Sequence, residues 1–271
     1  MSESERRTQI HPTAIIEPTV EIGEGVLVGA YSIIRGNVKI GDGTNIDSHV
    51  VIEGNTTIGK DNTFKSGCVI GGAPQDWGFK GEESYVVIGE KNIIRECVTI
   101  HRASGEGEST IIGDANMLMA YCHVGHNCKL GSHITMANSV GVSGHTVIED
   151  NVTFGGMTGI HQKLRVGKLA MVGGFSKVVQ DVPPFSMTDG RPSRVVDINI
   201  IGLRRNNVST KTRADLRKAY KILYRSNLNL TQALEVAYRD LELSPELEYL
   251  LEFVKGIRLG SRGRQLETPR L

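Results

Sequence analysis

Histidines at regular intervals are the residues of this sequence best suited to acid and base chemistry. His126, His145 and His161 follow one another at similar intervals, and His123 precedes the first of them. An imidazole titrates near neutral pH, so it can take a proton from a hydroxyl or an amine and return it. The spacing therefore predicts a site built by a structure that repeats at about the same interval.

Three interpretations of these histidines compete. General base chemistry needs only one imidazole and is the favoured interpretation. A zinc site would suit three imidazoles, but they would have to converge from stacked turns, and no adjoining carboxylate is available to orient them. The chain has eight histidines, so some could also align on the surface by chance. We predict a histidine base and no metal.

A six-residue repeat explains the interval. Counting in sixes from Ile10 to Val178, 26 of the 29 positions are apolar, where 39% hydrophobic content would give roughly 11. One six-residue unit with an inward aliphatic side chain is one side of a triangular coil, and three units complete a turn. We predict a parallel β-helix, in which the glycines that often follow the aliphatic residues supply backbone freedom at the corners.

The period also places residues on successive coils. Coils of a β-helix are about 4.8 Å apart, the ordinary strand spacing. Gly144 and Gln162 follow His126 by one and two complete turns, so they should lie in register with it. His126, His145 and His161 should then form a short ladder along one edge, with His123 nearby.

Interruptions of the repeat predict two loops. The three positions that break the pattern, Asp76, Glu82 and Glu106, lie in segments rich in glycine and polar residues. These segments should be loops near 71–85 and 102–110, and loops on a regular scaffold often carry function.

After Val178 the repeat gives way to helical spacing. Val182, Pro183 and Pro184 are expected to end the coil, and apolar residues recur at helical intervals from about residue 198. We predict a polar lead at 1–9, a β-helix at 10–182, an α-helical domain at 183–259 and a disordered tail at 260–271.

Composition excludes several classes of protein. The 31 basic and 30 acidic residues nearly cancel, so nothing predicts nucleic acid as a partner. No apolar stretch is long enough for a membrane span and no secretory signal opens the chain, so a cytoplasmic location is expected. The four cysteines lack CxxC spacing and should be reduced thiols, with Cys122 and Cys128 on small inward positions of the coil.

Several longer motifs resemble the UDP-N-acetylglucosamine acyltransferase family, whose members begin lipid A synthesis. The resemblance spans roughly residues 10–258. The motifs are HPTAII at 11–16, VTIHR at 98–102, HVGHNC at 123–128, SGHTVI at 143–148, GGMTGIHQ at 155–162, VGGFSKVVQDVPPF at 172–185 and NIIGLRR at 199–205.

The resemblance implies a reaction. An (R)-3-hydroxyacyl group would pass from acyl carrier protein to the 3-hydroxyl of UDP-N-acetylglucosamine. His126 matches the general base of the family, and the backbone N–H of Gly144 matches the donor to the oxyanion. No cofactor is implied beyond the phosphopantetheine of the carrier protein, and no covalent acyl-enzyme is required.

The same resemblance implies substrate contacts. The matched residues are His123, His145, His161 and Gln162 in the groove, Gln75 and Asp76 at the sugar or acyl hydroxyl, Asn199 and Arg205 at the nucleotide, and Gly174 at the floor of the acyl groove. An arginine can hold a diphosphate with paired hydrogen bonds. A glycine at the groove floor predicts a long acyl chain. Family members are homotrimers of left-handed coils with clefts between subunits, so we expect both features.

Three departures from the family pattern concern the acceptor. Asn127 follows the base where many relatives have an acidic residue, Gly78 stands where relatives often have lysine, and Ile201 replaces a polar residue. Lys80 is the nearest lysine that could substitute at the loop. These changes leave open a 3-amino sugar nucleotide as acceptor, which would give N-acylation.

Alternatives from other classes remain at this point. An acetyl-CoA-dependent sugar N-acetyltransferase would share the coil and differ in its donor. A metal-dependent hydratase of the carbonic anhydrase type would contain stoichiometric zinc. A non-catalytic scaffold would turn over no donor.

Overall fold

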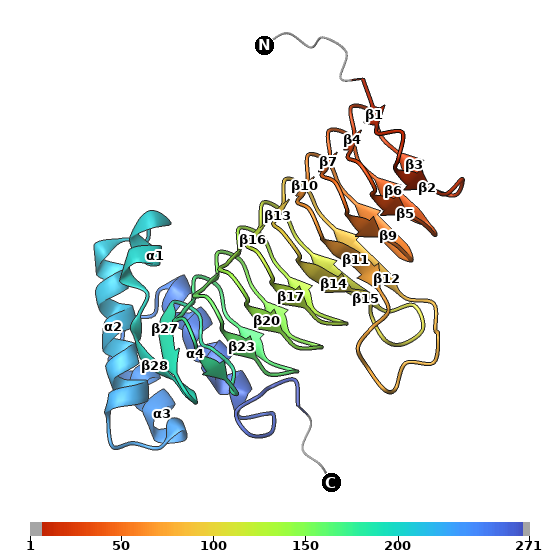
Figure 1. The fold of residues 1–271 in the computed structure, drawn as a ribbon. Helices are drawn as coiled ribbons and strands as arrows, with labels where there is room; N and C mark the ends of the chain where they lie inside the picture. Colours follow the sequence, from red (N-terminus) through yellow and green to blue (C-terminus); the bar gives the residue numbers. More distant parts are fainter. Residues whose placement is uncertain (1–6, 268–271) are drawn as a thin grey trace.

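The protein is a long parallel β-helix followed by a small helical region (Figure 1). The computed structural model describes residues 7–267. The coil has three sheets, one on each side of its triangular section, and strands within a sheet pair in parallel one turn apart, as in Ile15 with Ile33. The six-residue repeat therefore forms the predicted parallel β-helix.

Up to β26, each sheet collects every third strand of the chain, and the hairpin strands β27 and β28 are both added to sheet A. Sheet A contains β1 (Gln9–Ile10), β4 (Leu27–Val28), β7 (Asn45–Ile46), β10 (Thr63–Phe64), β13 (Ile93–Ile94), β16 (Met117–Leu118), β19 (Thr135–Met136), β22 (Thr153–Phe154), β25 (Met171–Val172), β27 (Ser186–Gly190) and β28 (Ser193–Ile198). Sheet B contains β2 (Ile15–Ile16), β5 (Ile33–Ile34), β8 (Val51–Ile52), β11 (Val69–Gly72), β14 (Thr99–His101), β17 (His123–Val124), β20 (Gly141–Val142), β23 (Gly159–Ile160) and β26 (Lys177–Val178). Sheet C contains β3 (Glu21–Ile22), β6 (Val38–Ile40), β9 (Asn55–Ile58), β12 (Tyr85–Ile88), β15 (Ser109–Ile112), β18 (Lys129–Leu130), β21 (Val147–Ile148) and β24 (Arg165–Val166).

The repeated aliphatic residues fill the inside of the coil. Ile52, Phe64 and Ile100 are fully buried in one continuous core. Burying a side chain of this size contributes about 1.5–3 kcal/mol. The first coil has no neighbour below it within the described residues, and Ile10 is accordingly exposed.

The glycines after the aliphatic residues have a different structural role from the predicted one. Gly29 and Gly125 do not have a left-handed backbone. A Cβ at Gly29 would instead lie 2.5 Å from the backbone nitrogen of Ser48 on the next coil. The left-handed residues come two positions later and are often not glycine, as with Asn127 and His145, both at φ 58°. Glycine is therefore needed for the close approach of coils.

Both predicted loops preserve the phase of the coil. Val69 pairs with Thr99, and Thr99 pairs with His123 on the following coil. The first of these pairs is separated by five six-residue units and the second by four, where a regular turn has three. Because each loop adds only whole units, the chain leaves the coil and returns without exchanging inward and outward side chains.

The C-terminal region begins with a hairpin that the sequence pattern did not predict. Strand β27 extends sheet A in parallel, and β28 pairs with it in antiparallel fashion. Helices α1 (Ile200–Arg205), α2 (Thr210–Arg225), α3 (Leu230–Asp240) and α4 (Pro245–Ile257) follow. They share a second core with Leu169 and Phe185 at the end of the coil. The six-residue phase has ended here, so it could not indicate the hairpin.

The tail differs from its prediction as far as residue 267. Residues 260–267 return to the last coil, where the Arg264 Nε donates to the Val179 carbonyl at 2.9 Å and the Gln265 N–H donates to the Asp181 Oδ2 at 2.9 Å. These contacts join segments that are far apart in the chain, so local composition could not reveal them. Residues 268–271, and residues 1–6 of the predicted lead, lie outside the described residues.

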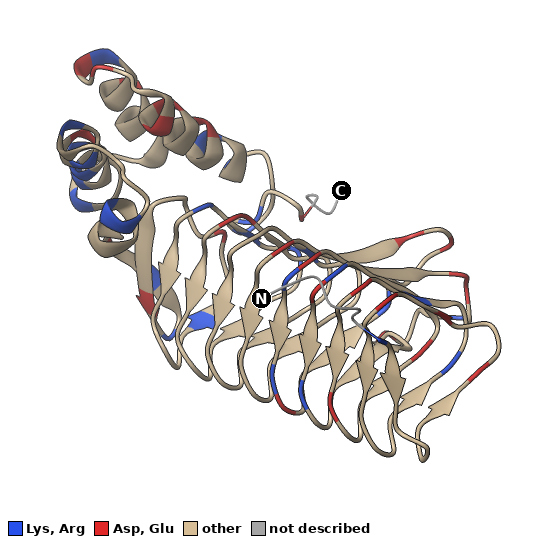
Figure 2. Ribbon diagram, turned by 90° about the horizontal axis from the view of Figure 1, so that it is seen from above, with Lys and Arg blue, Asp and Glu red and all other residues tan. Residues whose placement is uncertain are grey.

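Charge is unevenly distributed over the coil (Figure 2). The outward side chains of sheet B are uncharged until its last strand. In order they are Ile15, Ile33, Val51, Val69, Thr99, His123, Gly141, Gly159 and Lys177. Sheet C instead carries charged outward residues, such as Glu21 and Lys39, which form an ion pair at 2.9 Å.

Candidate active site

His126 lies at the corner between sheets B and C, and Asn127 fixes its tautomer. The Asn127 Nδ2 donates to the Ser104 carbonyl at 3.0 Å, and the Ser104 N–H donates to the Asn127 Oδ1 at 2.9 Å. This orientation leaves Oδ1 to accept from the His126 Nδ1 at 2.8 Å. The proton of the neutral imidazole is then on Nδ1, and the lone pair of Nε2 is available for a substrate proton.

Gly144 lies directly beside that nitrogen. A Cβ on Gly144 would be 2.5 Å from the His126 Nε2, so only glycine leaves space for a reacting atom there. The Gly144 N–H donates to no atom of the described residues. A free backbone donor next to the basic nitrogen is the arrangement needed to stabilise an oxyanion.

His145 and Asp76 surround the same space. The rings of His126 and His145 meet edge to face, with centroids 5.1 Å apart. Burial first, and then His126, lowers the pKa of His145. The pKa of Asp76 is lowered by the Gly78 N–H, which donates to its Oδ1 at 2.9 Å, then by Ser104, and also by His126 and His145. The first loop thus brings a carboxylate to the histidines.

His123 lies on the outer face of sheet B, beside two residues that the sequence analysis did not select. Its Nδ1 is 2.8 Å from the Thr99 Oγ1, and its ring meets His101 edge to face at 5.1 Å. Burial lowers the pKa of His123 to about 4, with His101 as the next cause. His123 is therefore neutral at physiological pH.

This neutral His123 predicts a loss of stability in acid. An unfolded histidine has a pKa of about 6.5, so between pH 6.5 and 4 the unfolded chain binds a proton that the folded chain does not. The free energy of unfolding must therefore fall as pH drops through this window, by roughly 2 kcal/mol after allowance for partial exposure. Denaturant unfolding at pH 7 and pH 4.5 should show a smaller loss for His123→Gln than for the unaltered protein. Equal losses in the two proteins would contradict the assignment.

The register of the remaining ladder follows the prediction. The His145 N–H donates to the His126 carbonyl, and the Lys163 N–H donates to the Gly144 carbonyl, both at 3.0 Å. Gln162 therefore lies one coil beyond Gly144. His161 precedes it on an exposed corner, with its Nδ1 3.0 Å from the Gln162 carbonyl oxygen. Gln75 is exposed on the first loop.

Gly174 lies at the corner between sheets A and B. The strands of sheet B begin at this corner and end at the corner that holds His126. Its neighbour on the preceding coil is Gly156, whose carbonyl oxygen would be 3.2 Å from a Cβ on Gly174. Between this corner and the histidines run Gly141 and Gly159, where a Cβ would meet open space. Six extended residues span roughly 20 Å. From the strand beside His126 to the strand beside Gly174 the path also crosses three strand spacings of about 4.8 Å each. The outer face of sheet B therefore offers an uncharged path somewhat longer than this width.

Asn199 and Arg205 lie on another edge of the molecule. The Asn199 Oδ1 caps α1 by accepting from the Gly202 N–H at 3.0 Å, and its Nδ2 donates to the Leu169 carbonyl at 2.8 Å. Leu169 belongs to the corner between sheets C and A. Arg205 is exposed and has no ion pair within the described part of the chain. A single chain therefore does not bring these two residues to the histidines, and Ile201 is exposed on the same helix.

The described residues near the base include neither a metal site nor a reactive thiol. Among residues 7–267, no three histidine, cysteine, aspartate or glutamate side chains are arranged to hold a metal ion. Cys122 and Cys128 point into the core as predicted, and burial raises their pKa values to about 11 and about 12. Within the same range, no helix is long and apolar enough to cross a bilayer.

Arg102 and Ser104 are site residues that the sequence analysis missed. Arg102 lies on the coil below His126, at the same offset that pairs Thr99 with His123. Its guanidinium lies 5.3 Å from the centroid of the Phe79 ring and its Nη1 donates to the Gly71 carbonyl at 3.1 Å, which fixes the base of the first loop. Counting back from His126 by one regular turn does not reach Arg102, because the second loop adds a six-residue unit between the two residues.

Comparison with known proteins gives a consistent result. The model of a family described as UDP-N-acetylglucosamine O-acyltransferase, domain 2, matches residues 181–264, and a model of the bacterial transferase hexapeptide (six repeats) matches residues 37–72. The acyl-(acyl carrier protein)–UDP-N-acetylglucosamine O-acyltransferase of Thermodesulfovibrio yellowstonii is 47% identical over 253 residues, which cover 93% of this chain and 98% of that protein.

Solved structures agree with these matches. UDP-N-acetylglucosamine acyltransferase from Bacteroides fragilis is 38% identical, with a TM-score of 0.89 over 97% of this chain and 100% of that one. LpxA from Acinetobacter baumannii is 40% identical, with a TM-score of 0.87 over 91% of this chain and 96% of that one.

Proposed function

The chain belongs to the UDP-N-acetylglucosamine O-acyltransferase family, and on this basis we propose that it transfers an acyl group from acyl carrier protein to UDP-N-acetylglucosamine in lipid A biosynthesis. The finer proposal is that the acyl group is an (R)-3-hydroxyacyl chain and that the 3-hydroxyl of the sugar accepts it. Among the observations, the free His126 Nε2 beside Gly144 carries the most weight.

The proposed reaction is a direct displacement at the thioester. The His126 Nε2 takes the proton of the 3-hydroxyl as its oxygen attacks the thioester carbonyl carbon. The Gly144 N–H donates to the oxyanion that forms. When the C–S bond breaks, the imidazolium returns the proton to the phosphopantetheine sulfur. Burial raises the pKa values of Cys68, Cys122 and Cys128, which supports a mechanism without an acyl-enzyme on these thiols.

The shape of sheet B supports an extended acyl groove. The uncharged face over Gly141 and Gly159 leads from the base to Gly174, which would end the groove. We expect Gly174→Met to shift the preferred donor to a shorter chain by several carbons, because the added side chain would occupy the end of the path. Competition among carrier-protein donors of graded length measures the preference, and Ser176→Ala, a substitution in the same coil at an inward position, is the matched control. An unchanged preference would count against this assignment.

The separation of the predicted substrate residues supports a site shared between subunits. Asn199 and Arg205 are on a different edge from His126 in one chain. The outer face of sheet B also exposes apolar side chains such as Ile15, which is 60% exposed, and exposed apolar surface of this kind commonly marks an interface. We therefore include a homotrimer, with clefts between neighbours, in the proposal.

Complementation between two inactive variants tests the shared site. His126→Ala and Arg205→Ala chains are coexpressed, so that mixed oligomers form. A site that takes the base from one subunit and the arginine from its neighbour would regain activity in a fraction of the clefts. Activity no higher than the mean of the separate variants would show that each chain forms its own site.

Product analysis tests the reaction and the acceptor. Purified protein is supplied with a panel of 3-hydroxyacyl carrier proteins or with acetyl-CoA as the donor, and with UDP-N-acetylglucosamine or its 3-amino analogue as the acceptor. Mass spectrometry should show an O-acylated product. Product from the amino sugar alone would change the acceptor and retain the base, and product only from acetyl-CoA would replace the proposal by the acetyltransferase alternative.

A further inference from the structure

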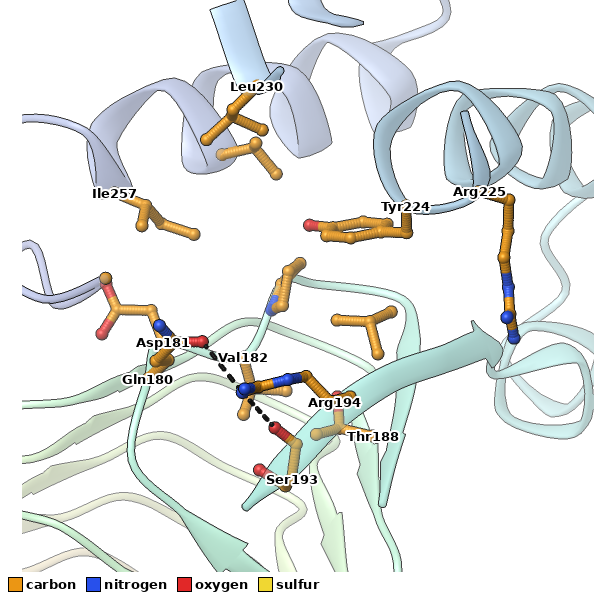
Figure 3. Close-up of a pocket in the computed structure, with 14 residues that line it drawn as sticks. Gln180, Asp181, Val182, Thr188, Ser193, Arg194, Tyr224, Arg225, Leu230 and Ile257 are labelled. Atoms are coloured by element: carbon orange, nitrogen blue, oxygen red, sulfur yellow. Dashed lines mark hydrogen bonds between the residues drawn. The ribbon is translucent and has the colours of Figure 1, made fainter. Parts of the chain in front are cut away.

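A cavity separate from the histidines lies between the last coil and the helices (Figure 3). Its volume is about 510 Å³, within the range of roughly 300–1,000 Å³ that small-molecule sites occupy. It is bounded by residues 180–183, the β27–β28 hairpin, the ends of α2 and α4, and the start of α3. The cavity thus lies between the β-helix and the helical C-terminal region.

The walls of this cavity are mainly apolar. The apolar contributors are Val182, Pro183, Val195, Leu230, Val254 and Ile257. Water in such a space finds few hydrogen-bond partners, whereas an alkyl chain would bury its surface against these side chains.

Tyr224 supplies a hydrogen-bond donor inside the cavity. Its hydroxyl points into the space (Figure 3) and has no hydrogen-bond partner within residues 7–267. Burial first, and then Tyr220, raises the pKa of Tyr224, so the hydroxyl keeps its proton. The hydroxyl oxygen is open to the cavity and not sealed in the core, so a ligand oxygen that enters the cavity can accept its proton.

Arg194 supplies a positive charge at the same cavity. Its Nη1 donates only to neutral oxygens at long distances, 3.4 Å to the Gln180 Oε1 and 3.3 Å to the Ser193 carbonyl. No carboxylate of the described residues pairs with it. Asp181 does not serve, since its side chain has no exposed surface and its oxygens accept from the Arg165 and Gln265 N–H groups.

We propose that this cavity binds a medium-chain carboxylic acid. The alkyl chain lies among the apolar walls, and the carboxylate takes the Arg194 guanidinium and the Tyr224 hydroxyl as its donors. A neutral chain would leave Arg194 without an anion, and a cationic chain would be repelled by it. This site does not depend on the proposed acyl transfer.

Calorimetric titration of the full-length protein with decanoate tests the proposal. One decanoate per chain should bind. Arg194→Gln should weaken binding about tenfold by removing the charge-assisted hydrogen bond, and Tyr224→Phe should weaken it severalfold. Arg191→Gln is the matched control, because Arg191 belongs to the same hairpin but packs on the Phe175 ring. It should leave the affinity unchanged.

Two further measurements separate this cavity from the acyl groove. Ile257→Trp, or Leu230→Phe if that variant does not fold, should abolish binding by filling the space while acyl transfer continues. Decanol, which has the same chain and no charge, should bind more weakly to the unaltered protein and be insensitive to Arg194→Gln. Decanoate affinity that survives both Arg194→Gln and the filling substitution would overturn the proposal, as would equal affinity for decanol.

Discussion

His126→Ala is expected to lower kcat for acyl transfer by about a thousandfold, because positioned acid–base groups contribute roughly 10²–10⁴ to rate. The hydroxyl would have to lose its proton to water, while the Gly144 N–H and the groove would remain. KM for both substrates should change little, since the imidazole is proposed to act mainly in the transition state. Steady-state rates with the carrier-protein donor and the sugar nucleotide measure the effect.

His133→Ala is the matched control for this experiment. His133 occupies the corner between sheets C and A. Its backbone is left-handed, at φ 59°, and its N–H donates to the Asp114 carbonyl on the preceding coil at 2.9 Å. It therefore reports what loss of a corner imidazole does to the coil alone. Equal activity losses in the two variants, or a His126→Ala enzyme within a factor of ten of the unaltered one, would remove His126 from the role of base.

The period of the sequence was sufficient to predict the fold class and the main ladder. The parallel β-helix, the helical C-terminal part and the family are confirmed. The predicted alignment of His126 with Gly144 is confirmed as well. It could be predicted because no loop interrupts the chain between these two residues. Local chain geometry decides which side chains point inward and which point outward. Each additional coil therefore repeats the same pattern of apolar and polar residues in the sequence.

What the sequence could not predict depends on contacts between distant segments. The orientation of Asn127 depends on Ser104, which the second loop delivers from the coil below. Asn199 matched a nucleotide-binding position, yet in this chain its side chain caps α1 and binds the Leu169 carbonyl. A motif identifies the residue type at a position but does not show which partners its side chain already has.

Removing the whole first loop is expected to abolish activity while the coil still folds. Deletion of residues 73–84 removes Gln75 and Asp76 and joins Gly72 directly to Tyr85. The deleted segment equals two complete six-residue units, so the offset between Val69 and Thr99 falls from five units to the regular three. The melting temperature should stay within a few degrees, whereas the acyl-transfer rate should fall by at least roughly a hundredfold because the positioning contacts are lost.

A deletion one residue shorter tests whether the phase is what preserves the fold. Removing residues 73–83 leaves one extra residue, and a slip of one position along a strand exchanges inward and outward side chains. Ile88, which is buried in the core, would then face solvent unless the chain forms a bulge, and either outcome costs stability. The shorter deletion should therefore melt at a clearly lower temperature than the longer one. Equal melting temperatures for the two deletions would show that the coil tolerates the extra residue. The register would then be set by the corners of the coil and not by the number of residues between them.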